Sequence, residues 1–554
     1  MTHPLLASRK WAFLLIFFIL LLNPLFYFWA EDVHLKDKCF AWITCIVAGA
    51  ALSVIDLFCK RRGEKIYLTM LFLLSCVPNF VVWSYLYLSR LYMKRDMFWV
   101  IFNSYSSEAK EYVHQFIPWQ LALAGFLYIG FCIFCIVKTH SSHAVSIKQR
   151  RTLFFSAVCI IIACIGFQYL SQAIPTIEFY KSHLLFRMEN RIFQKEKELR
   201  RQLTMEVKCV LPDSVNHVFV ILLGESTTTC HMSLYGYFRK TTPLMDRRAH
   251  ELDVYTDVVT PDTHTYGVMQ KVLTFANHQH PEYYMEKASV VELFNAAGFE
   301  SYWIANNPIL DKWGASYGVI AQQAHHVFDV SFAKKPDEIV LTSLRRILDD
   351  KEKGNKVIFI HLMGNHHAYR SRYPDLFEYF NYEKDRDLAD LGFRNDEMKA
   401  TIDAYDNSVL YGDYVYDSIL RELEKSDASS YLLFFSDHGE EVYDTRNASG
   451  HHLSNIYPCQ CKIPFVLWRS ESYEQENAAI DIDTKRPYSI ENVIYSISTL
   501  SGLEYQDNNP SLSVFSPKYV ASEKRMVGKE NYTEILKKIQ KTKNLLSSCV
   551  FVHP

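Results

Sequence analysis

Long apolar runs dominate the first third of the chain, and shorter ones recur through the rest. A membrane helix needs about 20 apolar residues. Five runs reach this length, at residues 11–30, 39–59, 66–88, 119–137 and 152–170. The first is not a cleaved signal peptide, because it is too long and no small-residue cleavage site follows it. The pattern predicts a multi-pass α-helical membrane domain with five spans over residues 1–171.

Basic residues in the loops predict the orientation of these spans. Arg9 and Lys10 precede the first span, whereas acids such as Glu31 and Asp32 dilute the cations of the first loop. The second and fourth loops are rich in cations: Lys60, Arg61, Arg62, Lys65, Lys138, Lys148, Arg150 and Arg151. Because cations favour the cytoplasmic side, we expect a cytoplasmic N-terminus and, after five spans, export of everything beyond residue 170. In a bacterial inner membrane this places the remainder in the periplasm.

Residues 172–205 combine many charges with apolar positions at helical spacing, among them Ile174, Ile177 and Leu184. This pattern predicts an amphipathic linker helix at the membrane surface. An ordinary solvated linker helix fits the pattern equally well.

From about residue 215 onward, short apolar runs alternate with helical stretches. The predicted strands are residues 218–223, 302–305, 357–362, 431–435 and 464–468. The clearest helical stretches between them are residues 290–297, 337–348 and 400–423. Such alternation indicates an α/β domain with a mostly parallel sheet, which we assign to residues 206–554.

Two predicted strands end in acidic residues. Glu225 follows the run at 218–223, and Asp437-His438 follows the run at 431–435. Ligands of parallel sheets gather at the carboxyl ends of the strands, and carboxylates with an imidazole bind metals such as zinc. The sequence therefore predicts a metal site at Glu225, Asp437 and His438. Taken singly, each residue could equally belong to a turn or cap a helix.

Thr265 is the candidate nucleophile beside this metal. Apolar residues follow it at helical spacing, at Val268, Val272 and Phe275. Thr265 would then be a helix N-cap, at a helix end that favours a phosphate anion. Spacing alone does not separate it from three other hydroxyls nearby, Ser226, Thr260 and Thr263.

Two histidine pairs follow predicted strands in the same domain. His366-His367 follows the run at 357–362, and His451-His452 lies one loop beyond Asp437. Imidazoles at these positions could hold a phosphoryl oxygen or protonate a leaving alcohol, although which member of each pair acts stays open. His361, inside its strand, is expected to be structural.

Charge and cysteine usage add smaller constraints. The formal net charge of −2 argues against a nucleic-acid partner. The exported part contains Cys209, Cys230, Cys459, Cys461 and Cys549. One disulfide is expected there, but its connectivity cannot be read, and Cys459 and Cys461 are too close to bridge each other easily.

Together these motifs resemble the membrane phosphoethanolamine transferases, within the alkaline phosphatase/sulfatase superfamily. The similar segments are Gly224-Glu-Ser-Thr227, Leu234-Tyr-Gly-Tyr-Phe-Arg-Lys-Thr-Thr-Pro243, Thr265 with Leu273-Thr-Phe275, Trp303-Ile-Ala-Asn-Asn307, His361-Leu-Met-Gly-Asn-His366, Tyr405-Asp-Asn-Ser408 and Ser436-Asp-His-Gly-Glu-Glu-Val-Tyr443. The resemblance covers nearly the whole chain and implies an α/β/α sulfatase-like periplasmic domain behind the spans.

The resemblance also implies roles for particular residues. Zn²⁺ would be held by Glu225, Thr265, Asp437 and His438, with Thr265 as the nucleophile. His366 and a histidine of the 451–452 pair, His451 or His452, would bind the substrate phosphate. Ser104 and Glu108, between the third and fourth spans, resemble polar residues that contact the phosphoethanolamine head group.

The implied reaction takes phosphoethanolamine from phosphatidylethanolamine to a lipopolysaccharide sugar. The Leu-Tyr-Gly-Tyr and Asp-His-Gly-Glu-Glu-Val-Tyr-Asp segments are most similar to the branch that modifies core heptose. The lipid A branch usually has cysteines flanking its nucleophile, and Pro261 stands where one of them would be. Lipid A transfer, phosphoglycerol transfer of the lipoteichoic acid synthase type, and an inactive scaffold or sensor are the alternatives. The intact residues Glu225, Thr265, Asp437 and His438 argue against the last.

Overall fold

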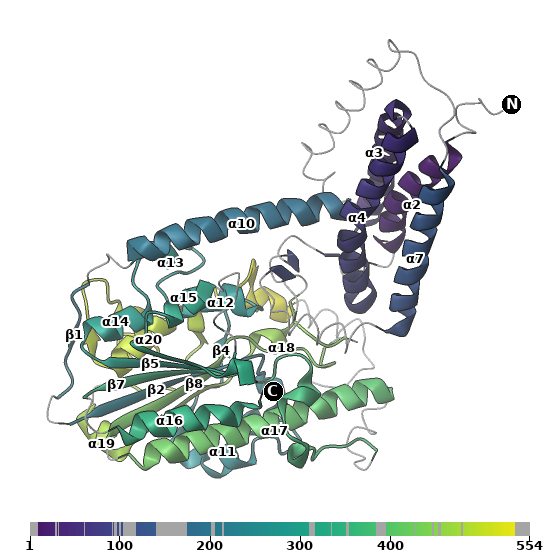
Figure 1. The fold of residues 1–554 in the computed structure, drawn as a ribbon. Helices are drawn as coiled ribbons and strands as arrows, with labels where there is room; N and C mark the ends of the chain where they lie inside the picture. The colour runs from purple at the N-terminus through teal and green to yellow at the C-terminus, as the bar shows by residue number, and fades with distance from the viewer. Residues whose placement is uncertain are drawn as a thin grey trace. The chain divides into compact units, whose positions relative to one another are not determined.

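The structure is a computed structural model that describes most of the chain. The described residues are 9–27, 30, 33–59, 61–90, 92–93, 97–98, 101–102, 118–139, 174–212 without 201–204, 215–307, 309, 316–333, 335–350, 354–383, 395–426, 428–445, 448–451, 456–477 and 480–537. They form two compact units, residues 1–189 and 190–554 (Figure 1).

The first unit contains four helices that are long and apolar enough to cross a membrane: α2 (Lys10–Tyr27), α3 (Leu35–Phe58), α4 (Arg61–Ser89) and α7 (Trp119–Lys138). They correspond to the first four predicted spans. The predicted fifth span, residues 152–170, lies outside the described residues, so the count of five stays a prediction. Helix α4 begins earlier than predicted, since the basic loop at residues 61–65 forms its first turn.

Helix α2 contacts the other three membrane helices. Its Asn23 accepts a hydrogen bond of 2.9 Å from the indole of Trp83 on α4, and the Trp83 ring packs edge-on against Tyr128 of α7. The hydrogen bond gives the buried Asn23 side chain a partner. The ring contact belongs to the apolar cluster between the helices.

The predicted linker forms helix α10 (Pro175–Arg200). Phe179 and Phe186, in its first half, pack against Phe102 with ring centroids 5.1 and 5.8 Å apart. The helix is therefore fixed to the first unit at its N-terminal end. Its position at a membrane surface stays a prediction.

The second unit is built on a seven-stranded sheet in the order β3-β9-β8-β2-β7-β5-β6. Strands β8 (Ser429–Ser436), β2 (His217–Gly224), β7 (Lys356–His361), β5 (Glu300–Ala305) and β6 (His326–Asp329) run parallel, whereas β9 (Phe465–Arg469) is antiparallel to both β8 and β3 (Leu252–Val254). The mostly parallel sheet and its five predicted strands are confirmed. Strands β3 and β6 are short edge strands that carry polar, half-buried positions, which explains why apolar runs did not predict them.

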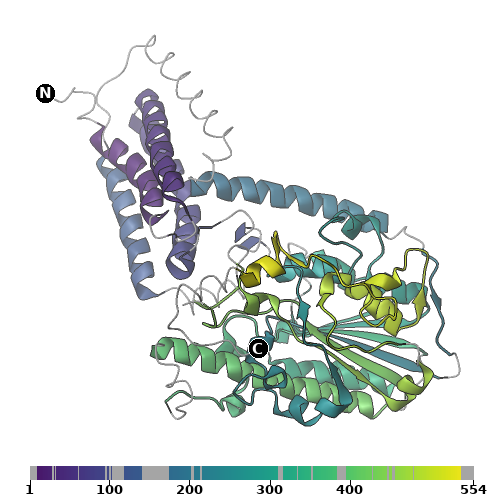
Figure 2. The ribbon, with the colours of Figure 1, turned by 180° about the vertical axis from the view of Figure 1, so that it is seen from behind.

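Helices cover both faces of this sheet, as Figures 1 and 2 show from opposite sides. One face packs on α12 (Thr265–Val272), α14 (Val290–Ala296), α15 (Ser316–Ala321) and α20 (Val493–Leu500). The other packs on α11 (Pro243–Arg247), α16 (Val340–Asp349) and α17 (Asp396–Glu424). The unit is thus an α/β/α sandwich, and the central strand β2 is buried on both faces, as its unbroken apolar run predicts.

Smaller elements complete the unit. They are the helices α13 (Tyr283–Glu286), α18 (Pro458–Cys461) and α19 (Glu471–Glu476), and the two-residue strands β1 (Lys208–Cys209), β4 (Val258–Val259), β10 (Tyr488–Ser489), β11 (Leu503–Glu504), β12 (Met526–Val527) and β13 (Glu530–Asn531). Of the helices predicted between the strands, residues 290–297 form α14, residues 400–423 lie within α17, and residues 337–348 form a 3₁₀ turn followed by α16.

Candidate metal centre and active site

Two neighbouring parallel strands bring the predicted metal ligands together. Strands β2 and β8 are in register up to Gly224 and Ser436, so the next residues, Glu225 and Asp437, emerge side by side. The Asp437 amide donates to the Gly224 carbonyl at 3.1 Å, and the Ser226 amide donates to Asp437 Oδ1 at 3.1 Å. Both acids are buried, and the strand register itself thereby sets their separation.

His438 completes the cluster. Its Nε2 lies 3.3 Å from Glu225 Oε1 and 3.5 Å from Asp437 Oδ2. One ligand atom from each of the three residues falls within 4.8 Å of the others. The imidazole is also fully buried. The structure therefore brings together the three side chains that the sequence predicted.

The hydrogen bonding of this cluster fits a metal. The Nδ1 atom of His438 donates to the Gly439 carbonyl at 2.9 Å, which in the neutral ring leaves a lone pair on Nε2 facing the two carboxylates. Among the described residues, neither His438 Nε2 nor Asp437 Oδ2 has a hydrogen-bond partner. Buried polar atoms are normally paired, and a cation between them would satisfy both. Two carboxylates and one imidazole form a donor set that suits zinc.

The electrostatics of the cluster also favour a cation between the two carboxylates. Burial, followed by the charge of Glu225, raises the pKa of Asp437 to about 8. Burial would also raise the pKa of Glu225, but the attraction of the nearby His438 imidazole holds it well below its usual value. The two acids compete for one positive neighbour, so an added cation would stabilise the state in which both are ionised.

Thr265 lies directly beside the cluster. Its Oγ1 donates to Glu225 Oε2 at 3.0 Å, from the first turn of α12. The predicted N-cap position was off by one residue: His264 is the cap, because its backbone is still extended while its carbonyl accepts the Val268 amide. Thr265 is the first helical residue.

The structure separates the four candidate hydroxyls. Ser226, Thr260 and Thr263 are fully buried, whereas Thr265 is half-buried. Thr260 donates to the carbonyls of Asp262 and Asp437, and Thr263 pairs with the His264 ring. Ser226 also contacts Glu225, at 2.8 Å, but it is inaccessible. Thr265 is the hydroxyl of the four that a substrate can reach.

The loop carrying His366 is laid against the backbone of Glu225. The Asn365 amide donates to the Glu225 carbonyl at 2.8 Å. Gly364 has a φ of 51°, and a Cβ there would lie 2.6 Å from the same carbonyl oxygen, so the close approach requires glycine. His366 is half-buried, its Nδ1 has no partner among the described residues, and burial followed by His367 lowers its pKa well below the usual value.

His451 also lies close to the cluster. Its ring centroid lies 4.3 Å from that of His438 and 4.8 Å from that of His264. His452, Ser104 and Glu108 lie outside the described residues, so their predicted roles remain untested. His361 is fully buried in β7, and burial lowers its pKa to about 4, which agrees with the structural role expected for it.

Three further residues contact this site, although the sequence analysis did not predict a role for them. Asn307 Nδ2 donates to Glu225 Oε2 at 3.3 Å. Glu440 contacts His451 and Tyr369. Asn307 ends the segment after β5 and Glu440 lies in the Asp-His-Gly-Glu segment, so their positions at strand ends were the available signal. Tyr369 lies in a short 3₁₀ turn with no such signal.

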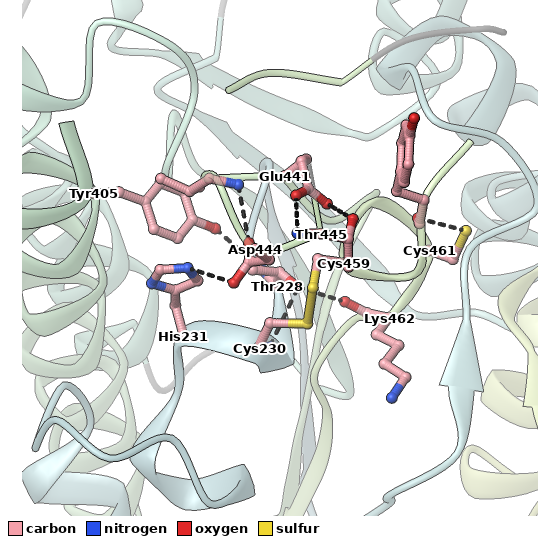
Figure 3. Close-up of a disulfide and its surroundings, with 12 residues drawn as sticks. Thr228, Cys230, His231, Tyr405, Glu441, Asp444, Thr445, Cys459, Cys461 and Lys462 are labelled. Atoms are coloured by element: carbon pink, nitrogen blue, oxygen red, sulfur yellow. Dashed lines mark hydrogen bonds and ion pairs between the residues drawn. A yellow bond between two sulfur atoms is a disulfide. The ribbon is translucent and has the colours of Figure 1, made fainter. Parts of the chain in front are cut away.

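A disulfide joins Cys230 and Cys459 (Figure 3). Cys230 lies in the loop after Glu225, and the residue after Cys459, Gln460, accepts a hydrogen bond of 3.0 Å from the Gly439 amide through its carbonyl. The bridge thus joins the loop after Glu225 to helix α18, which in turn contacts the loop that carries Asp437 and His438. A disulfide expected from the sequence is thus present, and Cys461 is a buried free thiol.

The chain is similar to several known proteins. The sulfatase family matches residues 217–503, which is more than half of the chain. Phosphoethanolamine transferase EptC of Escherichia coli (strain K12) is 26% identical over 499 residues, covering 85% of this chain and 86% of that protein. Phosphoethanolamine transferase CptA of Salmonella typhimurium is 32% identical over 312 residues, 54% of this chain and 53% of that protein.

Solved structures add to this likeness. The C-terminal periplasmic domain of E. coli EptC in complex with Zn is 30% identical and covers 59% of this chain and 94% of that chain, with a TM-score of 0.55. The integral membrane lipooligosaccharide phosphoethanolamine transferase A of Neisseria meningitidis, 19% identical, shares the fold over 90% of this chain and 98% of its own, with a TM-score of 0.66. The chain belongs to the sulfatase family, and it is similar along most of its length to proteins named phosphoethanolamine transferase.

Proposed function

We propose that this protein is a phosphoethanolamine transferase of a bacterial inner membrane, with its catalytic unit in the periplasm. The donor is phosphatidylethanolamine and the acceptor a lipopolysaccharide sugar. The observation that carries the proposal is the position of Thr265, an accessible hydroxyl 3.0 Å from Glu225, beside a buried carboxylate–imidazole cluster whose hydrogen bonds are incomplete. The names of the matching relatives give the transferred group.

In the proposed domain arrangement residues 1–171 form the membrane domain, 172–205 a surface helix and 206–554 the catalytic domain. Zn²⁺ held by Glu225, Thr265, Asp437 and His438 would stabilise negative charge at the reacting oxygens. His366 and His451 would hold the phosphoryl oxygens of the substrate. Ser104 and Glu108 are proposed to contact the ethanolamine head group.

The reaction proceeds in two displacement steps at phosphorus. The Thr265 oxygen attacks phosphorus, the bond from phosphorus to the glycerol oxygen breaks, and the proton lost by Thr265 ends on diacylglycerol. A sugar hydroxyl then attacks the same phosphorus, the bond to Thr265 breaks, and the sugar's proton returns to the threonine. Covalent catalysis of this kind divides one difficult displacement into two easier ones.

Core heptose is the favoured acceptor. Pro261 stands where lipid A transferases usually carry a cysteine flanking the nucleophile, and the Cys230–Cys459 bridge lies outside the segment around Thr265. Loss of one phosphoethanolamine mass from the core oligosaccharide of a deletion strain, with lipid A unchanged, would support heptose, and the opposite fragment pattern would support lipid A. Labelling the head group with ethanolamine or glycerol separates the proposal from phosphoglycerol transfer.

Intact mass of the full chain after incubation with phosphatidylethanolamine tests the nucleophile. The wild type should carry one phosphoethanolamine, and Thr265→Ala should carry none while retaining zinc in part. Thr263→Ala is the matched control, because its hydroxyl faces His264 rather than Glu225 and its loss should leave the adduct in place. An adduct that persists in Thr265→Ala, or that maps to Ser226, would refute the assignment.

A further inference from the structure

Glu440 is a buried carboxylate whose two oxygens form hydrogen bonds with residues of two different loops. Its Oε2 lies 2.7 Å from Nδ1 of His451, and its Oε1 accepts the Tyr369 hydroxyl at 2.6 Å. The side chain is fully buried. A carboxylate held in this way is an acceptor at both oxygens, so Nδ1 of His451 is the atom that carries the proton.

With the proton on Nδ1, the other ring nitrogen of His451, Nε2, is free to act as an acceptor in the active site. With Nδ1 donating to Glu440, Nε2 keeps its lone pair when the ring is neutral. The ring lies 4.3 Å from His438 and 4.8 Å from His264, at the edge of the metal cluster. A carboxylate behind a histidine fixes its tautomer and orientation, and it also raises the basicity of the free nitrogen.

The same carboxylate also holds the loop of His366. Tyr369 lies three residues beyond His366, in the 3₁₀ turn Tyr369–Arg372, and its hydroxyl also pairs with Ser449 at 3.1 Å. Arg372 in that turn donates to the carbonyls of His366 and His367. One buried acid thus connects the two histidine loops, which are far apart in the sequence.

The contacts of Glu440 favour a role other than metal binding. Ligand atoms of His438, Glu440 and His451 do lie within 4.8 Å of one another. However, both oxygens of Glu440 already accept hydrogen bonds, and His438 Nε2 faces Glu225 and Asp437. The contacts of Glu440 are those of a group that orients a histidine.

We propose that Glu440 is a positioning residue for the transfer reaction: it holds His451 with its proton on Nδ1 and its Nε2 toward the reacting phosphoryl group, and through Tyr369 it fixes the loop of His366. This inference rests on the proposed function for the identity of the reaction. The position of the His451 proton can be tested without it.

The neighbouring acid provides a matched control. Glu441 is equally buried, but its Oε1 accepts the Thr445 amide and its Oε2 the Thr445 hydroxyl, both within the same hairpin (Figure 3). Glu440→Gln and Glu441→Gln therefore remove one charge each from adjacent buried positions, and only the first removes a contact with His451.

The kinetic test uses the full chain in mixed micelles with phosphatidylethanolamine. Glu440→Gln should lower kcat about 10–100-fold, the usual effect of removing such a partner, with KM for the lipid and zinc content unchanged. Glu441→Gln should stay close to wild type. In a His451→Ala background, Glu440→Gln should add almost nothing, because the group that it positions is gone. Tyr369→Phe tests the second link and should lower kcat less than Glu440→Gln.

The second measurement is the tautomer of His451, read from nitrogen chemical shifts of the full chain labelled with ¹⁵N-histidine in bilayers, with His451→Gln for assignment. The wild type should carry the proton on Nδ1, and Glu440→Gln should carry it on Nε2, since the amide donates to Nδ1. Wild-type kcat in Glu440→Gln, full additivity with His451→Ala, or a proton on Nε2 in the wild type would each overturn the inference. A wild type that moves no phosphoethanolamine refutes the proposed function, while the tautomer still decides whether Glu440 positions His451.

Discussion

Two buried clusters in the catalytic unit each combine an imidazole with carboxylates. They differ in whether all of their polar atoms have hydrogen-bond partners within the protein. In the first, Nδ1 of His231 lies 2.6 Å from Asp406 and Nε2 lies 3.2 Å from Asp444. Arg239 adds a permanent positive charge, with 2.7 Å contacts to Asp403 and Asp406. Both nitrogens of the His231 ring are paired within the protein.

The second cluster, around His438, is incomplete. Nε2 of His438 and Oδ2 of Asp437 have no hydrogen-bond partner among the described residues, and no arginine balances the two carboxylates there. Yet the pKa of both imidazoles is raised to about 10, in each case because nearby carboxylates outweigh the effect of burial. The raised pKa is therefore common to both clusters, and the two atoms without a hydrogen bond distinguish the cluster that we propose binds a metal.

The membrane unit contains a third buried cluster, which like the first includes an arginine. Arg9 Nη1 lies 2.9 Å from Asp56 and 3.6 Å from Glu64, and all three side chains are buried. A guanidinium stays charged under all relevant conditions. Asp56 Oδ1 also lacks a hydrogen-bond partner among the described residues, so the permanent charge of the arginine, rather than complete hydrogen bonding, separates this cluster from the one around His438.

The largest expected effect follows from removing one ligand of the incomplete cluster. Asp437→Asn should abolish zinc retention and lower transfer by more than about 100-fold, because the metal loses an anionic ligand. Stability of the metal-free protein should be unchanged or higher, since the change relieves repulsion with Glu225. Elemental analysis, transfer kinetics and thermal unfolding in the presence of a chelator measure the three quantities. Full zinc occupancy in the variant would place the metal elsewhere.

The matching change in the complete cluster should have the opposite effects, lowering stability while leaving zinc binding intact. Asp406→Asn leaves His231 and Arg239 without their shared partner, and breaking a buried ion pair costs roughly 3–5 kcal/mol. The catalytic unit should unfold at a clearly lower temperature while the folded protein keeps its zinc. Circular dichroism and elemental analysis of the same sample show both. Loss of zinc with unchanged stability would remove the distinction between the clusters.

The sequence predicted the incomplete cluster better than the complete one, for a physical reason. Glu225 and Asp437 follow apolar strands, and parallel register brings strand ends together without knowledge of the loops. Asp406 lies within α17 and meets His231 only through the packing of that helix. No local pattern encodes such a contact across 175 positions.

The same limit applies to the fine structure of the site. That Thr265 is accessible while Thr263 is buried depends on how α12 packs, and spacing alone left the two unresolved. The contact of Glu440 with His451 requires the hairpin in which Val442 pairs with Ser449. The Cys230–Cys459 bridge joins residues 229 positions apart, so the sequence predicted a disulfide but could not give its partners.

The charge of His231 gives a pH-dependent test of the complete cluster. Its pKa is raised to about 10 in the folded protein, above the usual value near 6.5 of an unfolded chain. The stabilisation by its charge is therefore fully present below about pH 6.5 and is lost as pH rises toward 10. The groups that face the ring are Asp406, Asp444, Tyr237 and Tyr405.

His231→Gln should accordingly cost about 1–3 kcal/mol near pH 6, as expected when buried acceptors lose a charged donor. The difference from wild type should shrink steadily between about pH 6.5 and 10. Thermal unfolding of both proteins across this range measures it. A difference that is independent of pH would mean that His231 is neutral in the folded protein and acts only through packing.

The smallest expected effect concerns an ion pair that differs from all three clusters by its exposure. Arg370 contacts Asp375 and Glu378, but the side chain of Arg370 is 45% exposed and that of Asp375 is 92% exposed. Water screens such a pair and its side chains lose entropy in forming it, so exposed pairs contribute roughly 0–1 kcal/mol. Arg370→Ala should leave the melting temperature nearly unchanged, and added salt should erase any difference that remains. Because Arg370 lies only four residues beyond His366, a large loss of stability in this variant would show that proximity to the site matters more than burial. A negligible loss, beside the large one expected for Asp406→Asn, would establish burial as the property that makes these charge clusters structural.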